Sequence, residues 1–264
     1  MAPMAGPNPG WLERAGKLLF RWRSFTPVPL LILAVPLLWR SRGGGGPGWV
    51  AAGSALCVAG EALRAWVIGQ VPDGTSGQNE RLIATGLNTA GPYALTRNPL
   101  YLGNLLITLG LCVAAHEPVL LALVAALFAV QYRAIVAAEE AFLRERFAAR
   151  FDEYCSRVPR FWPSLNAAIR PWHAIASPGP WSWRRALRKE HNPIAAWLGL
   201  LIALLAADRF FGHAPPPPLR TLVPYAIAFA ILVAAWLAVK GWKHRWSSGG
   251  FAEDLRRRLR ETAR

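Results

Sequence analysis

The sequence predicts an all-α, polytopic helical membrane protein with about six membrane segments. Hydrophobic residues make up 53% of the 264 positions and charged residues only 17%. A soluble domain of ordinary composition is less apolar and more highly charged than this. The apolar residues are also gathered into runs that basic loops separate. We expect membrane segments at 27–39, 49–69, 100–115, 118–136, 193–207 and 219–239.

The first segment is interrupted by Pro29 and Pro36 and follows basic residues. No small-x-small cleavage site precedes the glycine run at 43–46, so we interpret it as a membrane segment rather than a cleaved signal peptide. The segment 49–69 is long enough to cross a bilayer, which requires about 20 residues. It carries two charges, Glu61 and Arg64, which either neutralise each other or face a substrate pocket.

The third and fourth segments form a short helical hairpin. The run 100–115 rises only about 24 Å at 1.5 Å per residue, less than a hydrocarbon core. We therefore expect this hairpin to sit shallow, to thin the bilayer or to lean on neighbouring helices. After it, 164–192 is an interfacial linker rich in proline and tryptophan, and the Asn192-Pro193 pair is expected to begin the next helix.

These elements divide the chain into four parts. Residues 1–77 hold the N-terminal membrane segments, 78–163 form a core of hairpin and following helix, 164–192 are the linker, and 193–264 form a C-terminal membrane hairpin with a basic tail.

The net charge of +15 has a membrane explanation. The basic residues lie between apolar runs, not among the interleaved aromatic residues of a nucleic-acid platform, so an anionic leaflet is the expected partner. The positive-inside rule places both termini and both ends of the core on the cytoplasmic side of a bacterial inner membrane or the endoplasmic reticulum. The three cysteines, far apart in the chain, predict neither a metal site nor a disulfide framework.

A turn with ligand-binding potential precedes the hairpin. Asn98 is expected to cap the helix that Pro99 opens, which leaves free backbone N–H groups just beyond. Such a helix start favours a carboxylate or phosphate, and Arg97 adds a full positive charge.

A carboxylate pair, Glu139-Glu140, follows the hairpin. We expect the pair to start a surface helix that lies on the membrane or folds back over the hairpin, because apolar residues follow at helical spacing. These residues are Leu143, Phe147, Phe151 and Tyr154. A site with a cationic and an anionic pole suits a zwitterion, such as the α-amino acid moiety of S-adenosylmethionine.

Taken together, these motifs resemble the isoprenylcysteine carboxyl methyltransferase and phospholipid methyltransferase superfamily of integral membrane enzymes. Its signature is Arg-His-Pro-x-Tyr, a helical hairpin, a Glu-Glu pair, and a Tyr followed by Val-Pro. The matching elements of this chain are Arg97-Asn98-Pro99-Leu100-Tyr101, Glu139-Glu140, Tyr154 and Val158-Pro159. The resemblance covers roughly 78–163.

The resemblance implies S-adenosyl-L-methionine as the cofactor and transfer of its methyl group as the reaction. It implies cofactor contacts at Gln78, Thr85, Gly86, Leu87, Asn88, Tyr93, Asn98, Pro99, Leu100, Tyr101 and Glu139. Glu139 falls on the family position that binds the cofactor, at its α-ammonium group. The expected catalytic residues are Arg97, Arg133 and Glu140, the last as a proton acceptor for an amine or thiol substrate.

Two departures from the family pattern bear on the substrate. Asn98 stands where the family has His, so this position hydrogen-bonds but does not titrate. In the isoprenylcysteine branch an Arg four residues before the cofactor Glu grips the substrate; that position is Ile135 here, although Arg133 is nearby. The expected substrate is thus lipophilic or lipid-linked and reached from the bilayer, with a carboxylate, amine or thiol acceptor.

Two other functions stay open. A sterol-type membrane reductase would use NADPH, and its turn resembles Arg-x-Pro-Asn-Tyr-x-Gly-Glu, whereas this chain has Leu100 and Asn104 at the discriminating positions. A non-enzymatic membrane protein would tolerate Glu139→Ala. In that case the carboxylate pair would be a solvated helix turn.

Overall fold

The computed structural model describes residues 11–22, 46–71, 84, 86–163, 180–211 and 217–262, and within them the chain is helical without strands. The predicted segment 27–39 and the predicted contacts Gln78 and Thr85 lie outside these residues. The helices are α1 (Trp11–Trp22), α3 (Pro47–Gln70), η1 (Gly91–Ala94), α4 (Pro99–Ala114), α5 (Pro118–Phe147), α6 (Ala149–Arg157), α9 (Trp183–Phe211), η2 (Leu219–Leu222) and α10 (Val223–Thr262).

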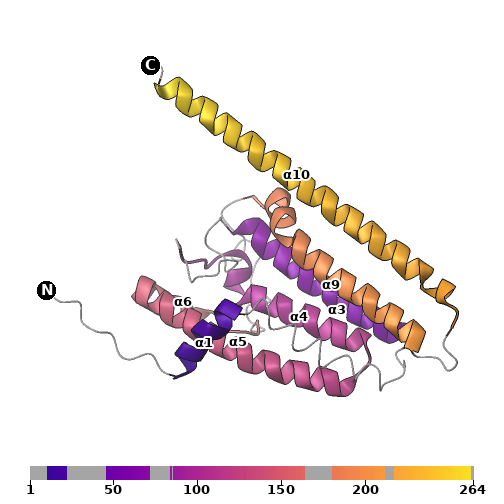
Figure 1. Ribbon diagram of the computed structural model, residues 1–264. Helices are drawn as coiled ribbons and strands as arrows, with labels where there is room; N and C mark the ends of the chain where they lie inside the picture. Colours follow the sequence, from indigo (N-terminus) through magenta and orange to yellow (C-terminus); the bar gives the residue numbers. More distant parts are fainter. Residues whose placement is uncertain are drawn as a thin grey trace.

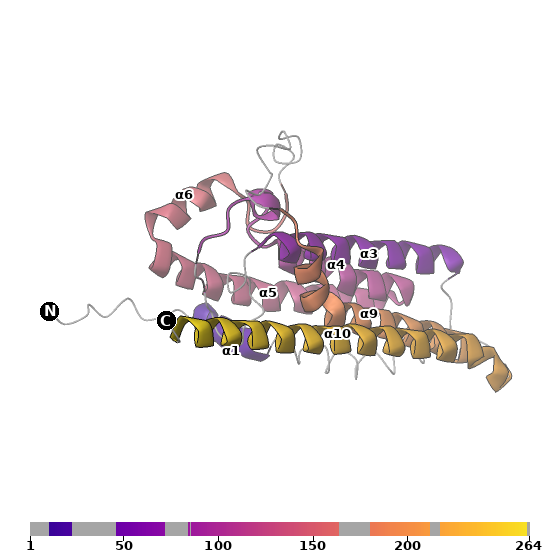
Figure 2. The ribbon, with the colours of Figure 1, turned by 90° about the horizontal axis from the view of Figure 1, so that it is seen from above.

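Among the described helices, 4 are long and apolar enough to cross a membrane: Pro47–Gln70, Pro118–Phe147, Trp183–Phe210 and Leu219–Lys243. The 16-residue α4 is apolar but shorter, as predicted for the first arm of the hairpin. The chain is thus a polytopic helical membrane protein. Figures 1 and 2 show α3, α4, α5 and α9 as neighbouring rods, with α10 along the outer side of α9.

Close approach of α3 and α4 is made possible by glycine. A Cβ added at Gly60 of α3 would lie 2.6 Å from the carbonyl oxygen of Gly103, and one added at Gly110 of α4 would lie 2.6 Å from that of Gly53. Small residues at such contacts let the backbones of two membrane helices touch. A Cβ at Gly103 would also lie 2.6 Å from Cγ of Arg64, so this glycine leaves the space in which the arginine stem crosses α4.

The hairpin is closed by a short link with its own cap. Glu117 accepts a hydrogen bond from the N–H of Val119 at 3.2 Å, and Pro118 occupies the first position of α5. A side-chain acceptor at the N-cap and a proline at the first position are both favourable at a helix start. The sequence of this link therefore fixes where α5 begins.

The expected surface helix beginning at Glu139 and Glu140 is wrong: both residues lie inside α5, which continues unbroken to Phe147. Nothing in the Ala-, Glu- and Leu-rich stretch around them disfavours a helix, so the helix does not stop where the apolar run stops. The break comes at Ala148, with a φ of 44°, and α6 follows it.

The expected apolar stripe exists, and it folds α6 back over the chain before α4. Phe151, Tyr154 and Val158 form a buried cluster. Partly buried residues from α5 and from the loop before η1 pack against it, including Leu143 and Leu87. Burial of these side chains is the main force that closes the core on itself.

Helix α9 starts ten residues before the predicted position, so the expected helix start at Asn192-Pro193 is also wrong. Pro193 lies inside α9. The residues at the start of α9 are instead held against the end of α3: the N–H of Ser182 and the guanidinium of Arg185 both donate to the carbonyl of Gly69, at 2.9 and 3.2 Å. This tertiary anchor outweighs the backbone hydrogen bond that a proline removes.

The glycine contact predicts a specific sensitivity to a single methyl group. Gly60→Ala should lower the free energy of unfolding by about 1–3 kcal/mol, because its Cβ meets backbone rather than a flexible side chain. Gly48→Ala in the same helix is the matched control, since nothing lies within 4 Å of the added Cβ. Thermal unfolding of detergent-solubilised protein measures both; equal melting temperatures would contradict the close contact.

Candidate active site

The Arg-Asn-Pro turn is tied to the segment that follows α6. The N–H of Arg97 donates to the carbonyl of Pro159 at 2.9 Å, and Nδ2 of Asn98 donates to that of Arg160 at 2.8 Å. The hydroxyl of Thr96, a residue only 2% exposed, donates to the carbonyl of Phe161 at 2.8 Å. The segment after α6 therefore lies as a strap across the start of α4. The two segments that these hydrogen bonds join are some sixty positions apart in the chain.

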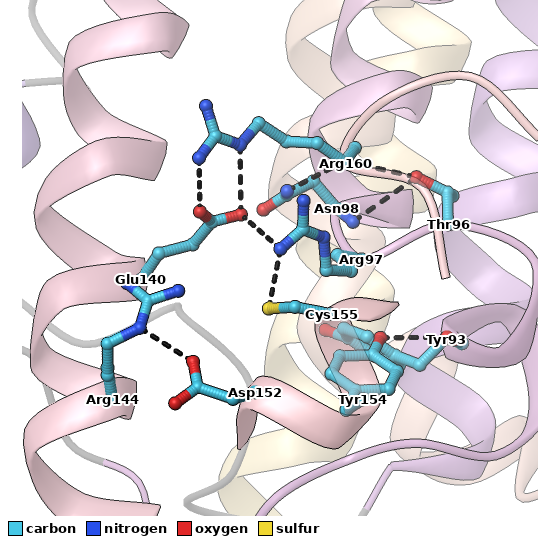
Figure 3. A network of polar contacts seen from close by, with 10 residues as sticks. All are labelled: Tyr93, Thr96, Arg97, Asn98, Glu140, Arg144, Asp152, Tyr154, Cys155 and Arg160. Atoms are coloured by element: carbon cyan, nitrogen blue, oxygen red, sulfur yellow. Dashed lines mark hydrogen bonds and ion pairs between the residues drawn. The ribbon is translucent and has the colours of Figure 1, made fainter. Parts of the chain in front are cut away.

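Glu140 closes the strap with two ion pairs (Figure 3). Its Oε1 lies 3.2 Å from Nη1 of Arg97, and Arg160 binds it with both Nε and Nη2, at 3.1 and 2.5 Å. The Glu140 side chain is only 6% exposed. Arg97 also donates to Sγ of Cys155 in α6. The predicted catalytic residues Arg97 and Glu140 are thus bound to each other, and the guanidinium of Arg97 compensates a protein carboxylate.

Glu139 points to a different neighbour. The hydroxyl of Tyr101 in α4 donates to its Oε1 at 2.8 Å. Burial, and next the negative charge of Glu139, raise the pKa of the Tyr93 hydroxyl well above its usual value. The carboxylate is half-buried and lies beside two of the predicted cofactor residues. The hairpin therefore brings Glu139 into contact with Tyr101, and the Glu139 charge is near enough to affect the pKa of Tyr93 in η1.

The start of α4 lies next to this carboxylate and presents the positive end of the helix dipole. Asn98 takes the N-cap position, as predicted, but its side chain makes no capping hydrogen bond, because the amide group is turned to the strap. Pro99 has no N–H, so the first backbone donor of the helix is that of Leu100. A positive helix end and a carboxylate are thus joined through Tyr101.

The loop before η1 packs on α6. Leu87 contacts the buried cluster around Phe151, and Gly86 and Asn88 beside it are partly buried. The hydroxyl of Tyr154 donates to the carbonyl of Tyr93 at 2.8 Å. Tyr154 therefore ties η1 to α6.

Comparison with known proteins agrees with this geometry. Residues 49–150 match the phospholipid methyltransferase family. That segment is of the phospholipid methyltransferase type, within the isoprenylcysteine carboxyl methyltransferase superfamily. It runs from α3 into α6 and contains both the Arg-Asn-Pro turn and the Glu-Glu pair. The resemblance seen in the sequence is confirmed, and α9 and α10 lie outside the matched segment.

Two curated proteins share part of the chain. The cobalt-zinc-cadmium resistance protein CzcN of Cupriavidus metallidurans is 42% identical over 80 residues, which are 30% of this chain and 37% of that protein. The nickel-cobalt-cadmium resistance protein NccN of Alcaligenes xylosoxydans xylosoxydans is 37% identical over 83 residues, 31% of this chain and 38% of that protein. The matches thus span less than two fifths of either relative. No solved structure matches the chain.

The two α5 positions that bear on the substrate differ in exposure. Arg133 has an exposed side chain on α5, two helical turns before Glu140. Ile135, at the position of the family's substrate-gripping Arg, is fully buried. No cluster of three or more His, Cys, Asp and Glu side chains fit to hold a metal ion occurs among the described residues.

Sequence reasoning missed Arg160 and Thr96. Arg160 directly follows the Val158-Pro159 motif and supplies the shorter, bidentate pair to Glu140. The position of Arg160 next to the Val-Pro motif could have indicated a partner for the Glu-Glu pair. Thr96 directly precedes the Arg-Asn-Pro turn. Its hydroxyl bonds the carbonyl groups of Arg160 and Phe161, which come near it only in the folded chain.

A second polar cluster lies between α3, α4 and α9. Arg64 binds Glu190 of α9 through Nε and Nη2, at 2.7–3.0 Å, and also donates to Oδ1 of Asn104. Of the two alternatives for Glu61 and Arg64, the mutual pair is replaced by a pair between Arg64 and Glu190 of α9. Glu61 instead accepts a hydrogen bond from Nε1 of Trp197 at 3.1 Å.

Removal of the charge at Glu140 should loosen the strap. Glu140→Gln leaves two guanidinium groups without their buried counter-charge, which is expected to cost about 3 kcal/mol or more of unfolding free energy. Asp152→Asn is the matched control: its pair with Arg144 is about half exposed on both sides, so less than about 1 kcal/mol is expected. Denaturant titration compares them; a Glu140→Gln effect as small as that of Asp152→Asn would contradict the clamp.

The Tyr154 hydroxyl predicts a loss of stability in alkali. Burial, followed by the nearby Tyr93, raises the pKa of Tyr154 far above the value of about 10 for an unfolded tyrosine. Its contribution is therefore complete below about pH 10 and is lost as the pH rises toward the folded-state pKa. Melting temperatures between pH 8 and 11 should fall less steeply for Tyr154→Phe than for the wild type, and parallel curves would contradict the assignment.

Proposed function

We propose that this protein is an integral membrane methyltransferase that uses S-adenosyl-L-methionine and methylates a lipophilic or membrane-accessed carboxylate, amine or thiol. The membership of residues 49–150 in the phospholipid methyltransferase family supports the reaction class. The observation that carries the proposal is the contact between Glu139 and Tyr101 at the start of α4.

The residues present fit the α-amino acid end of the cofactor. A carboxylate suits the positive end of α4, where the side chain of Asn98 makes no capping hydrogen bond. An ammonium suits the carboxylate of Glu139 next to it. In this assignment the half-buried loop around Gly86 and Asn88, together with Tyr93, lies beside the rest of the molecule.

The cofactor, when bound, supplies an activated methyl group on a sulfonium. The tasks left to the chain are to bind, to align the acceptor and to exclude water. Glu140 serves alignment indirectly: its two carboxylate oxygens are already engaged by the guanidinium groups of Arg97 and Arg160. We therefore propose that Glu140 positions the strap and does not take a proton from the substrate.

The acceptor is proposed to arrive from the bilayer. Helices α3, α5, α9 and α10 have the length and composition of membrane spans, so a lipophilic molecule can reach the core sideways. The buried Ile135 provides no cation for a prenylcysteine carboxylate, and the exposed Arg133 is the nearest candidate for that role on α5. We propose that the site faces the cytoplasm, where the basic loops are expected.

The proposal predicts cofactor binding that depends on Glu139. Detergent-solubilised wild type should bind S-adenosylmethionine in calorimetry, and Glu139→Gln should weaken binding by roughly tenfold or more, because a charge-assisted contact is worth about 1.5–3 kcal/mol. Glu145→Gln, an exposed glutamate on the same helix, should bind like the wild type.

The same titration with NADPH separates the alternatives. Binding of NADPH without S-adenosylmethionine would favour a reductase. Binding of neither molecule would favour a non-enzymatic protein. Incubation of membranes with methyl-labelled cofactor then shows whether label enters lipid, protein or a volatile product.

A further inference from the structure

A continuous line of side chains joins α9 to the proposed cofactor site. It begins at Glu190, which is 1% exposed and binds Arg64 of α3 through three hydrogen bonds of 2.7–3.0 Å. The pair is buried, so each charge depends on the other for compensation. Glu190 lies well beyond residues 49–150, the segment that matches the methyltransferase family.

The line continues through an amide that is held at both ends. Arg64 donates to Oδ1 of Asn104, and Nδ2 of the same residue donates to the hydroxyl of Tyr132 at 3.3 Å. Rotation of this amide would put its NH₂ group against the guanidinium and its oxygen against the phenol. The buried cation therefore fixes which way Asn104 points.

Tyr132 carries the line to the site through its ring. It packs edge-on against Tyr101, with ring centroids 4.7 Å apart, and stacks on Phe128 at 3.9 Å. Confined between these two rings, Tyr132 limits the positions open to Tyr101. Tyr101 in turn donates to Glu139 at 2.8 Å.

We propose that α9 is part of the methyltransferase site: Glu190 and Arg64 are positioning residues that set the Tyr101–Glu139 pair through Asn104 and Tyr132. This inference rests on the proposed function, since it assigns the pair to cofactor binding. It gives α9 a function beyond its membrane span. The line crosses the bundle through contacts between side chains of four different helices, α9, α3, α4 and α5.

A purely structural role for the pair makes a different prediction. If Glu190 only stabilised the helix bundle, its loss would weaken cofactor binding independently of Tyr101, and the two effects would add. If it acts through Tyr101, removal of the tyrosine hydroxyl already removes most of what Glu190 contributes. A double-mutant cycle separates the two cases.

The experiment measures S-adenosylmethionine binding by calorimetry on the full-length protein in detergent. Glu190→Gln is expected to weaken binding by roughly 2- to 30-fold, the range for residues that act on a site through others. In a Tyr101→Phe background, the same substitution should change affinity less than twofold. Trp236→Phe is the control, because it breaks the α9–α10 hydrogen bond to Asn192 without touching the line, and should bind like the wild type.

Glu190→Gln leaves Arg64 buried without its counter-charge, which can destabilise the fold. Tyr132→Phe interrupts the same line of contacts without leaving a charge unpaired. It removes one hydroxyl and keeps both ring contacts, and a two- to tenfold loss of affinity is expected. Unchanged binding in both variants, or full additivity with Tyr101→Phe, would overturn the inference while the proposed function stands. A wild type that binds no S-adenosylmethionine would overturn both.

Discussion

The buried carboxylate of Glu140 is the interaction on which the arrangement of the site depends. It lies 3.2 Å from one guanidinium, before the hairpin, and is bound in bidentate fashion by a second, after α6. In a largely apolar protein a buried carboxylate is stable only when its charge is compensated. Neither arginine can reach Glu140 unless the chain folds back on itself. The electrostatic requirement and the burial of Phe151 and Tyr154 therefore favour the same closed core.

Adjacent glutamates on one helix divide two tasks. Successive residues of an α-helix point about 100° apart, so Glu139 and Glu140 face different neighbours. One is directed to the strap and closes the core; the other meets Tyr101 at the start of α4. The strap also explains the missing cap on α4: the amide of Asn98 donates to the carbonyl of Arg160 and makes no capping hydrogen bond.

Local chemistry made part of this predictable. Apolar run lengths gave the spans of α3, α5 and α10 and the shortness of α4, and Pro99 marked the start of the hairpin. The family resemblance implied that Glu139 and Tyr101 serve one cofactor, and the two side chains are hydrogen-bonded. These features depend on composition and on near neighbours in the chain.

The features that the sequence left undetermined depend on distant partners. Nothing within α5 indicates that Glu139 and Glu140 have different partners. The difference comes from the strap, whose Arg160 binds Glu140. The early start of α9 rests on hydrogen bonds from Ser182 and Arg185 to Gly69, more than a hundred residues away. The nearest acidic residue to Arg64 in its own segment is Glu61, three positions away, but Arg64 binds Glu190 of α9, 126 positions along the chain. Pairings of this range follow from packing, which periodicity alone does not specify.

An experimental structure with S-adenosylhomocysteine bound tests the central claim most directly. The account predicts that the amino group of this product lies within hydrogen-bond distance of Glu139, that its carboxylate meets the backbone N–H groups at the start of α4, and that Glu140 stays paired with Arg97 and Arg160. Density for the ligand elsewhere, with Glu139 turned into solvent, would contradict it.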